Sequence, residues 1–369
     1  MMGLIINKGD YKMSEIKMGF RWFNSDDNIS LQQISQIPQV SQIVSALNLS
    51  AGDVWPLDAI KQLKKSINSQ GFEFKVVESV NVNDDIKAGL PTRDEYIENY
   101  ITSLKNLSLA GVEVVCYNFM PVFDWIRTNL RAPSNDGSFS MQFKKAQLPQ
   151  SPLKLSESVT ETINSYTLPG WEADRLAGLT QIMHKYDGVT ETQLRENLAY
   201  FLKAIIPVCE QEHITMAIHP DDPPMSVFEL PRIYKNIEDM RLIENMVPSQ
   251  QNAFTICTGS LGENPQNDVP AIITEMMSRG KVPFVHLRNV RHLNALGDFE
   301  ESAHESSTGS LDMFQIMKAL SDSGFHGYAR PDHGRDIWGE SGRPGYGLFD
   351  RALGISYLNG LWESLQKMR

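Results

Sequence analysis

Short apolar runs alternate with longer amphipathic stretches along most of the chain. The runs predict eight strands, at residues 18–23, 42–46, 72–77, 112–117, 215–219, 253–257, 283–287 and 328–330. The longer stretches predict helices at residues 57–68, 92–109, 190–211, 227–236, 269–278, 311–323 and 349–367. Strands that alternate with helices pair in parallel through right-handed crossovers. An open, doubly wound sheet is the alternative, but eight such units favour a closed (β/α)8 barrel of the TIM type.

Two segments fall outside this alternation. Residues 131–187 follow the fourth strand and carry prolines and glycines among polar residues, which predicts a long insertion with a helix of its own near residues 156–165. Residues 1–17 precede the first strand, and we expect them to form an N-terminal extension that need not be ordered. We therefore expect one barrel domain over residues 18–369, with the insertion inside it.

Composition and charge narrow the classes of partner. The chain has 369 residues, of which 41% are hydrophobic and 21% charged, which is enough apolar material for a barrel core. The net charge of -11 argues against nucleic acid and anionic membranes as partners, although a small anion can still bind a locally basic pocket. The sequence lacks an apolar run long enough for a transmembrane helix, and its start is a poor signal peptide. The three cysteines (Cys116, Cys209 and Cys257) lack paired spacing, so we expect a reducing, cytoplasmic setting.

Four polar residues end successive predicted strands. His219 ends the run TMAIH, Cys257 ends AFTIC, His286 ends PFVH, and Asp332 follows GYARP. In a barrel these ends converge on the face that carries the active site. Two imidazoles, a thiolate and a carboxylate are a plausible ligand set for a divalent transition metal. Taken singly, each residue is more often a packing or turn residue, so the prediction rests on the four together.

Neighbouring residues suggest further roles. His333 follows Asp332 and can transfer protons near neutral pH. Tyr346 lies between two glycines, which indicates either a close backbone approach or an ordinary loop. Asn118 follows the fourth strand and either faces the same mouth or packs in an aromatic loop. Three arginines are candidates to bind a carboxylate, with a solvated surface role as the alternative: Arg288, Arg335 and Arg343. The sequence contains neither a dinucleotide-binding nor a P-loop motif.

Several long segments together resemble mannonate dehydratase. They are MGFRWF, AGDVW, CYNFMPVFDW, AIHPDDPP, CTGSLG, VHLRNV, RPDHGR and RPGYGLFDRALG, in this order between residues 18 and 354. The resemblance therefore covers most of the chain and is far more specific than one short motif.

The resemblance implies a xylose-isomerase-like barrel that dehydrates D-mannonate to 2-keto-3-deoxy-D-gluconate in hexuronate (glucuronate) breakdown, with Mn²⁺ or Fe²⁺. The metal ligands that it implies are the four named above. The acid–base residues that it implies are His333 and Tyr346, and we predict Asn118, Arg288 and Arg335 as substrate-binding residues. We also expect a homo-oligomer, specifically a dimer. Two alternatives stay open: a sugar isomerase or epimerase on the same barrel, and a non-catalytic barrel that holds structural zinc.

Overall fold

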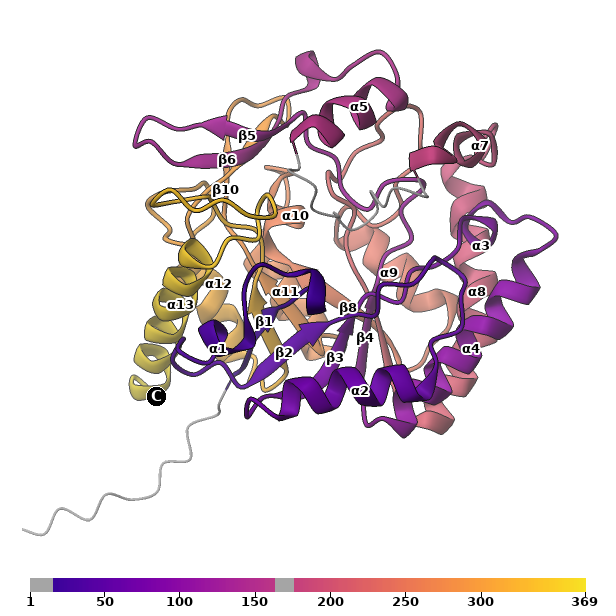
Figure 1. Cartoon of the computed structure of the whole chain (residues 1–369), viewed down its shortest axis with the longest axis horizontal. Helices are drawn as coiled ribbons and strands as arrows, with labels where there is room; N and C mark the ends of the chain where they lie inside the picture. Colours follow the sequence, from indigo (N-terminus) through magenta and orange to yellow (C-terminus); the bar gives the residue numbers. More distant parts are fainter. Residues whose placement is uncertain (1–15, 163–175) are drawn as a thin grey trace, which may run out of the picture.

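The computed structural model describes residues 16–162 and 176–369, and eight of its strands close into a parallel barrel (Figure 1). Around the barrel the order is β1-β12-β9-β8-β7-β4-β3-β2, and every adjacent pair is parallel. The bounds of these strands are β1 (Lys17–Arg21), β2 (Gln42–Ser45), β3 (Glu73–Glu78), β4 (Val114–Tyr117), β7 (Thr215–Ile218), β8 (Asn252–Cys257), β9 (Phe284–Leu287) and β12 (Tyr328–Pro331). The predicted barrel is confirmed.

Each barrel strand is followed by a helix of the outer layer before the next barrel strand. These helices are α1 (Leu31–Ile34), α2 (Leu57–Asn68), α4 (Arg93–Leu109), α8 (Glu191–Glu212), α9 (Ile237–Met246), α11 (Val269–Ser278), α12 (Met313–Asp322) and α13 (Phe349–Lys367). Two short helices, α3 (Asp84–Ala88) and α10 (Thr258–Gly262), follow β3 and β8, and the 3₁₀ turn η1 (Asn24–Asp26) follows β1. The main apolar core lies between the helices and the outer face of the strands.

Side chains that point into the barrel form a separate cluster. It consists of Val44, Val76, Val114, Cys116, Ala217, Phe284 and Tyr328. Alternate residues of a strand point to opposite faces. A residue two or four positions after a member of this cluster therefore also points inward, at or just beyond the carboxyl-terminal mouth. This alternation decides which polar side chains reach the mouth.

A four-stranded antiparallel sheet lies above the mouth (Figure 1), and the sequence pattern did not predict it. Its order is β10-β11-β6-β5, which joins β5 (Asn129–Pro133) and β6 (Phe139–Phe143) to β10 (Val290–His292) and β11 (Phe299–Glu301). β10 and β11 have three residues each, which is too little periodicity to be recognised, and the pairing of β11 with β6 is non-local.

The region between β4 and α8 also contains η2 (Lys145–Gln147), α5 (Pro152–Thr162) and α7 (Leu179–His184). The helix predicted near residues 156–165 overlaps α5, and its last residues lie outside the described part of the chain. Of the predicted extension at residues 1–17, only the last two residues are described, and Lys17 already begins β1.

The helix predicted at residues 227–236 is wrong. Phe228 and Glu229 have positive φ angles of 54° and 62°, and an isolated β-bridge joins Val227 to Leu230. The Asp221 carboxylate then accepts hydrogen bonds from the backbone amides of residues 233 and 234, at 2.7 and 2.8 Å. These contacts hold the segment in a non-helical path, so α9 begins at Ile237 instead. None of the helices in the described ranges has the length and apolar character required to cross a bilayer.

Candidate metal centre and catalytic pair

The four predicted metal ligands meet at the mouth of the barrel, where their donor atoms lie within 4.8 Å of one another. His219 lies two residues after Ala217 of the interior cluster, and His286 two residues after Phe284. Strand alternation therefore turns both imidazoles inward. Cys257 and His286 are paired across β8 and β9. The prediction that the four residues converge is confirmed.

The two imidazoles present ring nitrogens to each other. His219 Nε2 lies 3.1 Å from His286 Nδ1. His219 Nδ1 lies 2.7 Å from the Pro220 carbonyl oxygen, and His286 Nε2 lies 3.2 Å from Glu78 Oε2. The Pro220 carbonyl favours a proton on His219 Nδ1, and Arg330 Nη2, 3.3 Å from His286 Nδ1, can only donate to that atom, so both inner nitrogens carry lone pairs. Burial, with Arg330 adding to it, lowers the pKa of His286 to about 4, so its ring is neutral at pH 7. Two facing lone pairs are well explained by a shared cation.

The thiol of Cys257 completes the set with Asp332. Its Sγ lies 3.3 Å from Asp332 Oδ2 and accepts from the Ser260 amide and hydroxyl, at 3.4 and 3.1 Å. Burial and the nearby Asp332 charge raise the pKa of the thiol. A bound cation would reverse this, because metal coordination deprotonates a thiol. Two imidazole nitrogens, a sulfur and a carboxylate oxygen therefore fit a divalent transition metal.

A second set of donors, from Glu78, Cys116 and His286, is also close enough for a metal. Glu78 is already paired with Arg330 at 2.6 Å, and Cys116 Sγ accepts from Thr255 at 3.3 Å. Glu78 is therefore better explained as the carboxylate that orients His286, a common partner of metal-binding imidazoles.

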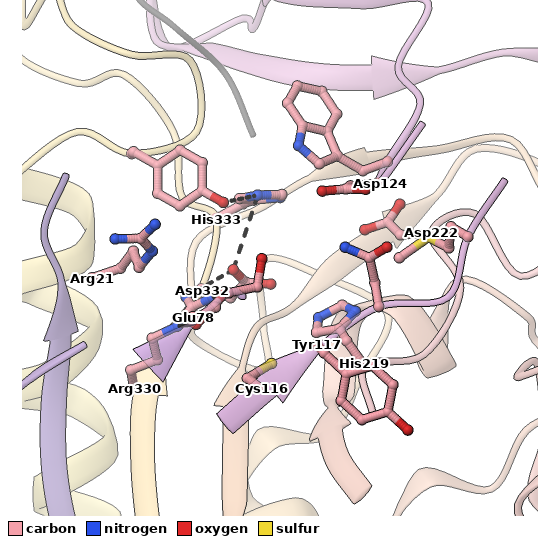
Figure 2. Close-up of a pocket in the computed structure, with 15 residues that line it drawn as sticks. Arg21, Glu78, Cys116, Tyr117, Asp124, His219, Asp222, Arg330, Asp332 and His333 are labelled. Atoms are coloured by element: carbon pink, nitrogen blue, oxygen red, sulfur yellow. Dashed lines mark hydrogen bonds and ion pairs between the residues drawn. The ribbon is translucent and has the colours of Figure 1, made fainter. Parts of the chain in front are cut away.

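His333 and Tyr346 form a buried pair beside this centre. His333 Nε2 lies 2.9 Å from Tyr346 Oη, and His333 Nδ1 lies 3.4 Å from Glu301 Oε1. Burial, followed by the Asp332 charge, raises the pKa of Tyr346, so its phenol stays protonated. Glu301 favours a proton on Nδ1, which leaves Nε2 to accept from the phenol. Both residues line one cavity together with Asp332 (Figure 2).

Arg288 is not among the residues that line this cavity, so a direct contact with a ligand there is not supported. It lies in a buried ionic cluster of five side chains: Arg127, Asp222, Glu263, Arg288 and Glu301. Arg288 pairs with Asp222 at 2.8 Å and with Glu301 at 2.7 Å. Its guanidinium is therefore held by protein carboxylates behind the metal centre.

Arg335 also lies outside the cavity lining, so a direct contact with a ligand there is not supported either. Its guanidinium pairs with Asp350 at 2.8 Å and with Asp136 at 3.2 Å. The third candidate, Arg343, stacks over Phe23, with 3.7 Å between the guanidinium carbon and the ring centroid, and lines a neighbouring hollow. Asn118 does line the cavity, and its buried Oδ1 has no hydrogen-bond partner in the described structure.

The cavity lies at the carboxyl-terminal mouth of the barrel, where β1, β3, β4 and β12 contribute residues to its lining. Its charged lining includes three residues that the sequence analysis missed: Arg21, Glu78 and Arg330 (Figure 2). Glu78 lies two residues after Val76 of the interior cluster, and Arg330 two residues after Tyr328. Strand alternation was thus the signal that could have identified them.

The family model described as "D-mannonate dehydratase (UxuA)" matches residues 16–369. The chain belongs to the mannonate dehydratase family. A curated mannonate dehydratase from Lactococcus lactis subsp. cremoris (strain MG1363) is 52% identical over 355 residues, which are 95% of this chain and 99% of the relative. The predicted resemblance is confirmed.

Solved structures agree with membership of the mannonate dehydratase family. The crystal structure of mannonate dehydratase from Streptococcus suis serotype 2 superposes with a TM-score of 0.87 at 41% identity, and covers 96% of each chain. A xylose isomerase domain protein from Planctomyces limnophilus has a TM-score of 0.54 at 10% identity, over 96% of this chain and 98% of that one. This second likeness shows the fold alone and confirms the xylose-isomerase-like barrel.

Proposed function

We propose that this chain dehydrates D-mannonate to 2-keto-3-deoxy-D-gluconate, as a hydro-lyase. The observation that carries the proposal is the His333–Tyr346 pair, 2.9 Å apart, in a cavity that His219 and Asp332 of the four converging metal-ligand side chains also line. Membership of the mannonate dehydratase family supports the same substrate over the isomerase, epimerase and structural-zinc alternatives.

Removal of the proton on carbon 2, next to a carboxylate, is the difficult step. Mn²⁺ or Fe²⁺, bound by His219, Cys257, His286 and Asp332, would act as a Lewis acid that stabilises the negative charge formed when this proton leaves. His333 and Tyr346 supply the proton transfers, each of which contributes ~10²–10⁴-fold to the rate in comparable enzymes.

The hydrogen-bond partners suggest which residue takes which role. Glu301 holds the proton on His333 Nδ1, so the Nε2 lone pair, which accepts from the Tyr346 phenol in this structure, is the one that can take a proton. We therefore assign His333 as the base that accepts the proton from carbon 2 when the phenol turns to the leaving hydroxyl. Tyr346 remains protonated, so we assign it as the acid that protonates the leaving hydroxyl on carbon 3. Water departs, and the resulting enol tautomerises to the 2-keto acid. The 2.9 Å hydrogen bond between the two residues lets the proton gained by His333 return to Tyr346.

The test of the proposed function is turnover of D-mannonate by stripped protein to which metals are added back singly. We expect Mn²⁺ or Fe²⁺ to restore formation of a 2-keto acid. D-gluconate is the matched control, because its carbon 2 proton points to the opposite face. A product that retains all the oxygen atoms of the substrate would favour an isomerase or epimerase. Stoichiometric zinc without turnover would favour a structural site.

The roles of the pair can be separated by exchange of the carbon 2 proton in D₂O. Tyr346→Phe should exchange this proton into solvent without forming product, because its base is intact. His333→Gln should neither exchange the carbon 2 proton nor form product, while its metal content stays normal. Exchange by His333→Gln together with none by Tyr346→Phe would reverse the two assignments.

The proposal also covers the cellular compartment and the oligomeric state of the protein. We propose a cytoplasmic enzyme of hexuronate breakdown, which its three buried, unpaired cysteines support, since such thiols persist in a reducing compartment. We also propose a homodimer. Trp338, with 73% of its surface exposed, lies against the partly exposed Phe349, and such apolar surface is typical of subunit contacts.

A further inference from the structure

Arg21, the last residue of β1, is a buried cation at the edge of the cavity (Figure 2). Only 6% of its surface is exposed. Its Nη1 donates to the Trp22 carbonyl oxygen at 2.6 Å, and its guanidinium carbon lies 4.1 Å from the centroid of the Phe23 ring. No carboxylate of the described residues forms an ion pair with it.

Burial of a guanidinium without a counter-charge costs free energy. Burial lowers the pKa of Arg21 to about 10, although the more distant Glu78 charge opposes this shift, and the side chain stays cationic near neutral pH. A buried cation that lines a cavity and forms no ion pair with a carboxylate of the described residues indicates that an anionic ligand supplies the missing contact.

The other arginine of the cavity lining is already neutralised. Arg330 donates to Glu78 at 2.6 Å and to Asp332 at 2.8 Å. Arg21 is therefore the arginine of this lining whose guanidinium is left for a ligand. Arginine is well suited to that task, because its planar fork matches both oxygens of a carboxylate.

The position of Arg21 also relates it to the catalytic pair. Tyr346 packs edge-on against Phe23, with 4.8 Å between ring centroids, so Arg21 and Tyr346 share one aromatic neighbour. His333 is hydrogen-bonded to Tyr346. An anionic group held by Arg21 thus lies beside the two residues that transfer protons. In D-mannonate, the atoms next to the carboxylate are carbons 2 and 3, where the bonds change.

We propose that Arg21 binds the substrate carboxylate and thereby positions carbons 2 and 3 against His333 and Tyr346. This inference rests on the proposed function, since D-mannonate supplies the carboxylate. It replaces the roles predicted for Arg288 and Arg335, whose guanidiniums are paired with protein carboxylates.

The test compares Arg21→Met and Arg21→Lys with the unmodified, metal-loaded protein. A charge-assisted pair contributes ~1.5–3 kcal/mol, so Arg21→Met should raise the KM for D-mannonate by ~10–100-fold. The KM of Arg21→Lys should lie between those of Arg21→Met and the unmodified protein, because lysine keeps the charge but lacks the planar fork of the guanidinium. The matched control is Arg131→Met. Arg131 also stacks on a ring, 4.4 Å from the centroid of Phe139, but does not line the cavity, so its KM should not change.

Calorimetric binding separates recognition of the carboxylate from a structural role. In a His333→Gln background, which stops turnover, adding Arg21→Met should weaken D-mannonate binding by the same ~10–100-fold. Binding of the neutral amide, D-mannonamide, should not change. Equal losses for both ligands, or an unchanged affinity for D-mannonate, would overturn the assignment of Arg21. Absence of turnover by the unmodified protein would reject the proposed function itself. An active protein whose Arg21→Met variant keeps the normal KM would reject only the role of Arg21.

Discussion

Glu263 and Glu301 lie in the same buried ionic cluster, and replacing each of them with glutamine tests which of the two carries a charge in the folded protein. Asp222, Glu263 and Glu301 are three carboxylates that surround two guanidiniums, so one negative charge is in excess. Burial, followed by the Asp222 charge, raises the pKa of Glu263 well above its usual value. Burial also opposes the ionisation of Glu301, but Arg288 and Arg127 outweigh it and hold that pKa at about 2. We therefore expect Glu263 to be protonated and Glu301 to be ionised at pH 7.

The expected magnitudes follow from this difference. Glu263→Gln replaces a neutral acid with a neutral amide of the same shape. In the unmodified protein Glu263 Oε1 accepts from Arg288 Nη2 at 2.5 Å, and the amide oxygen of glutamine can still accept this hydrogen bond. The free energy of unfolding should change by less than ~1 kcal/mol. Glu301 accepts from Arg288 Nε at 2.7 Å, and from Arg288 Nη2 and Arg127 Nη2 at 2.9 Å each. Glu301→Gln removes that buried charge and should cost ~3–5 kcal/mol.

The assay is urea denaturation of both variants and the unmodified protein in the same metal state, followed by circular dichroism. The midpoint should fall for Glu301→Gln and stay nearly constant for Glu263→Gln, with similar slopes for all three proteins. Equal destabilisation by the two substitutions would refute the reasoning, because it would mean that both carboxylates carry a charge in the folded protein.

Four further predictions concern the metal and the assembly. Glu78→Gln should weaken Mn²⁺ binding by ~10–100-fold in equilibrium dialysis, because Glu78 orients His286, and an unchanged affinity would contradict this role. Cys257→Ser should lower the metal content measured by elemental analysis, and a full complement would remove Cys257 from the ligand set; activity of the unmodified protein should also fall in air and return with reductant. Trp338→Glu should dissociate the proposed dimer in light scattering, whereas an intact dimer would place the interface away from Trp338 and Phe349.

The alternation of apolar and polar residues was sufficient to predict the barrel and its four converging side chains. Both depend on short-range periodicity: helices bury one face, and strands place alternate residues inside. His219 and His286 follow interior residues by two positions, so a correct strand assignment already implies that they point inward. The helix expected at residues 227–236 failed because the Asp221 carboxylate captures two backbone amides of that segment, and this contact is not visible in local propensity.

The tertiary structure decided which charged residues face the cavity. Arg288 follows His286 closely in sequence, yet carboxylates from three other segments hold its guanidinium in the ionic cluster. Arg21 lies near the start of the described chain, and closure of the barrel through the β1–β12 pairing brings it to the strand that carries Arg330. The local sequence determines secondary structure and the direction of each side chain. Pairing between distant charges depends on which segments become neighbours, so only the folded barrel distinguishes a neutralised arginine from one that is left for a ligand.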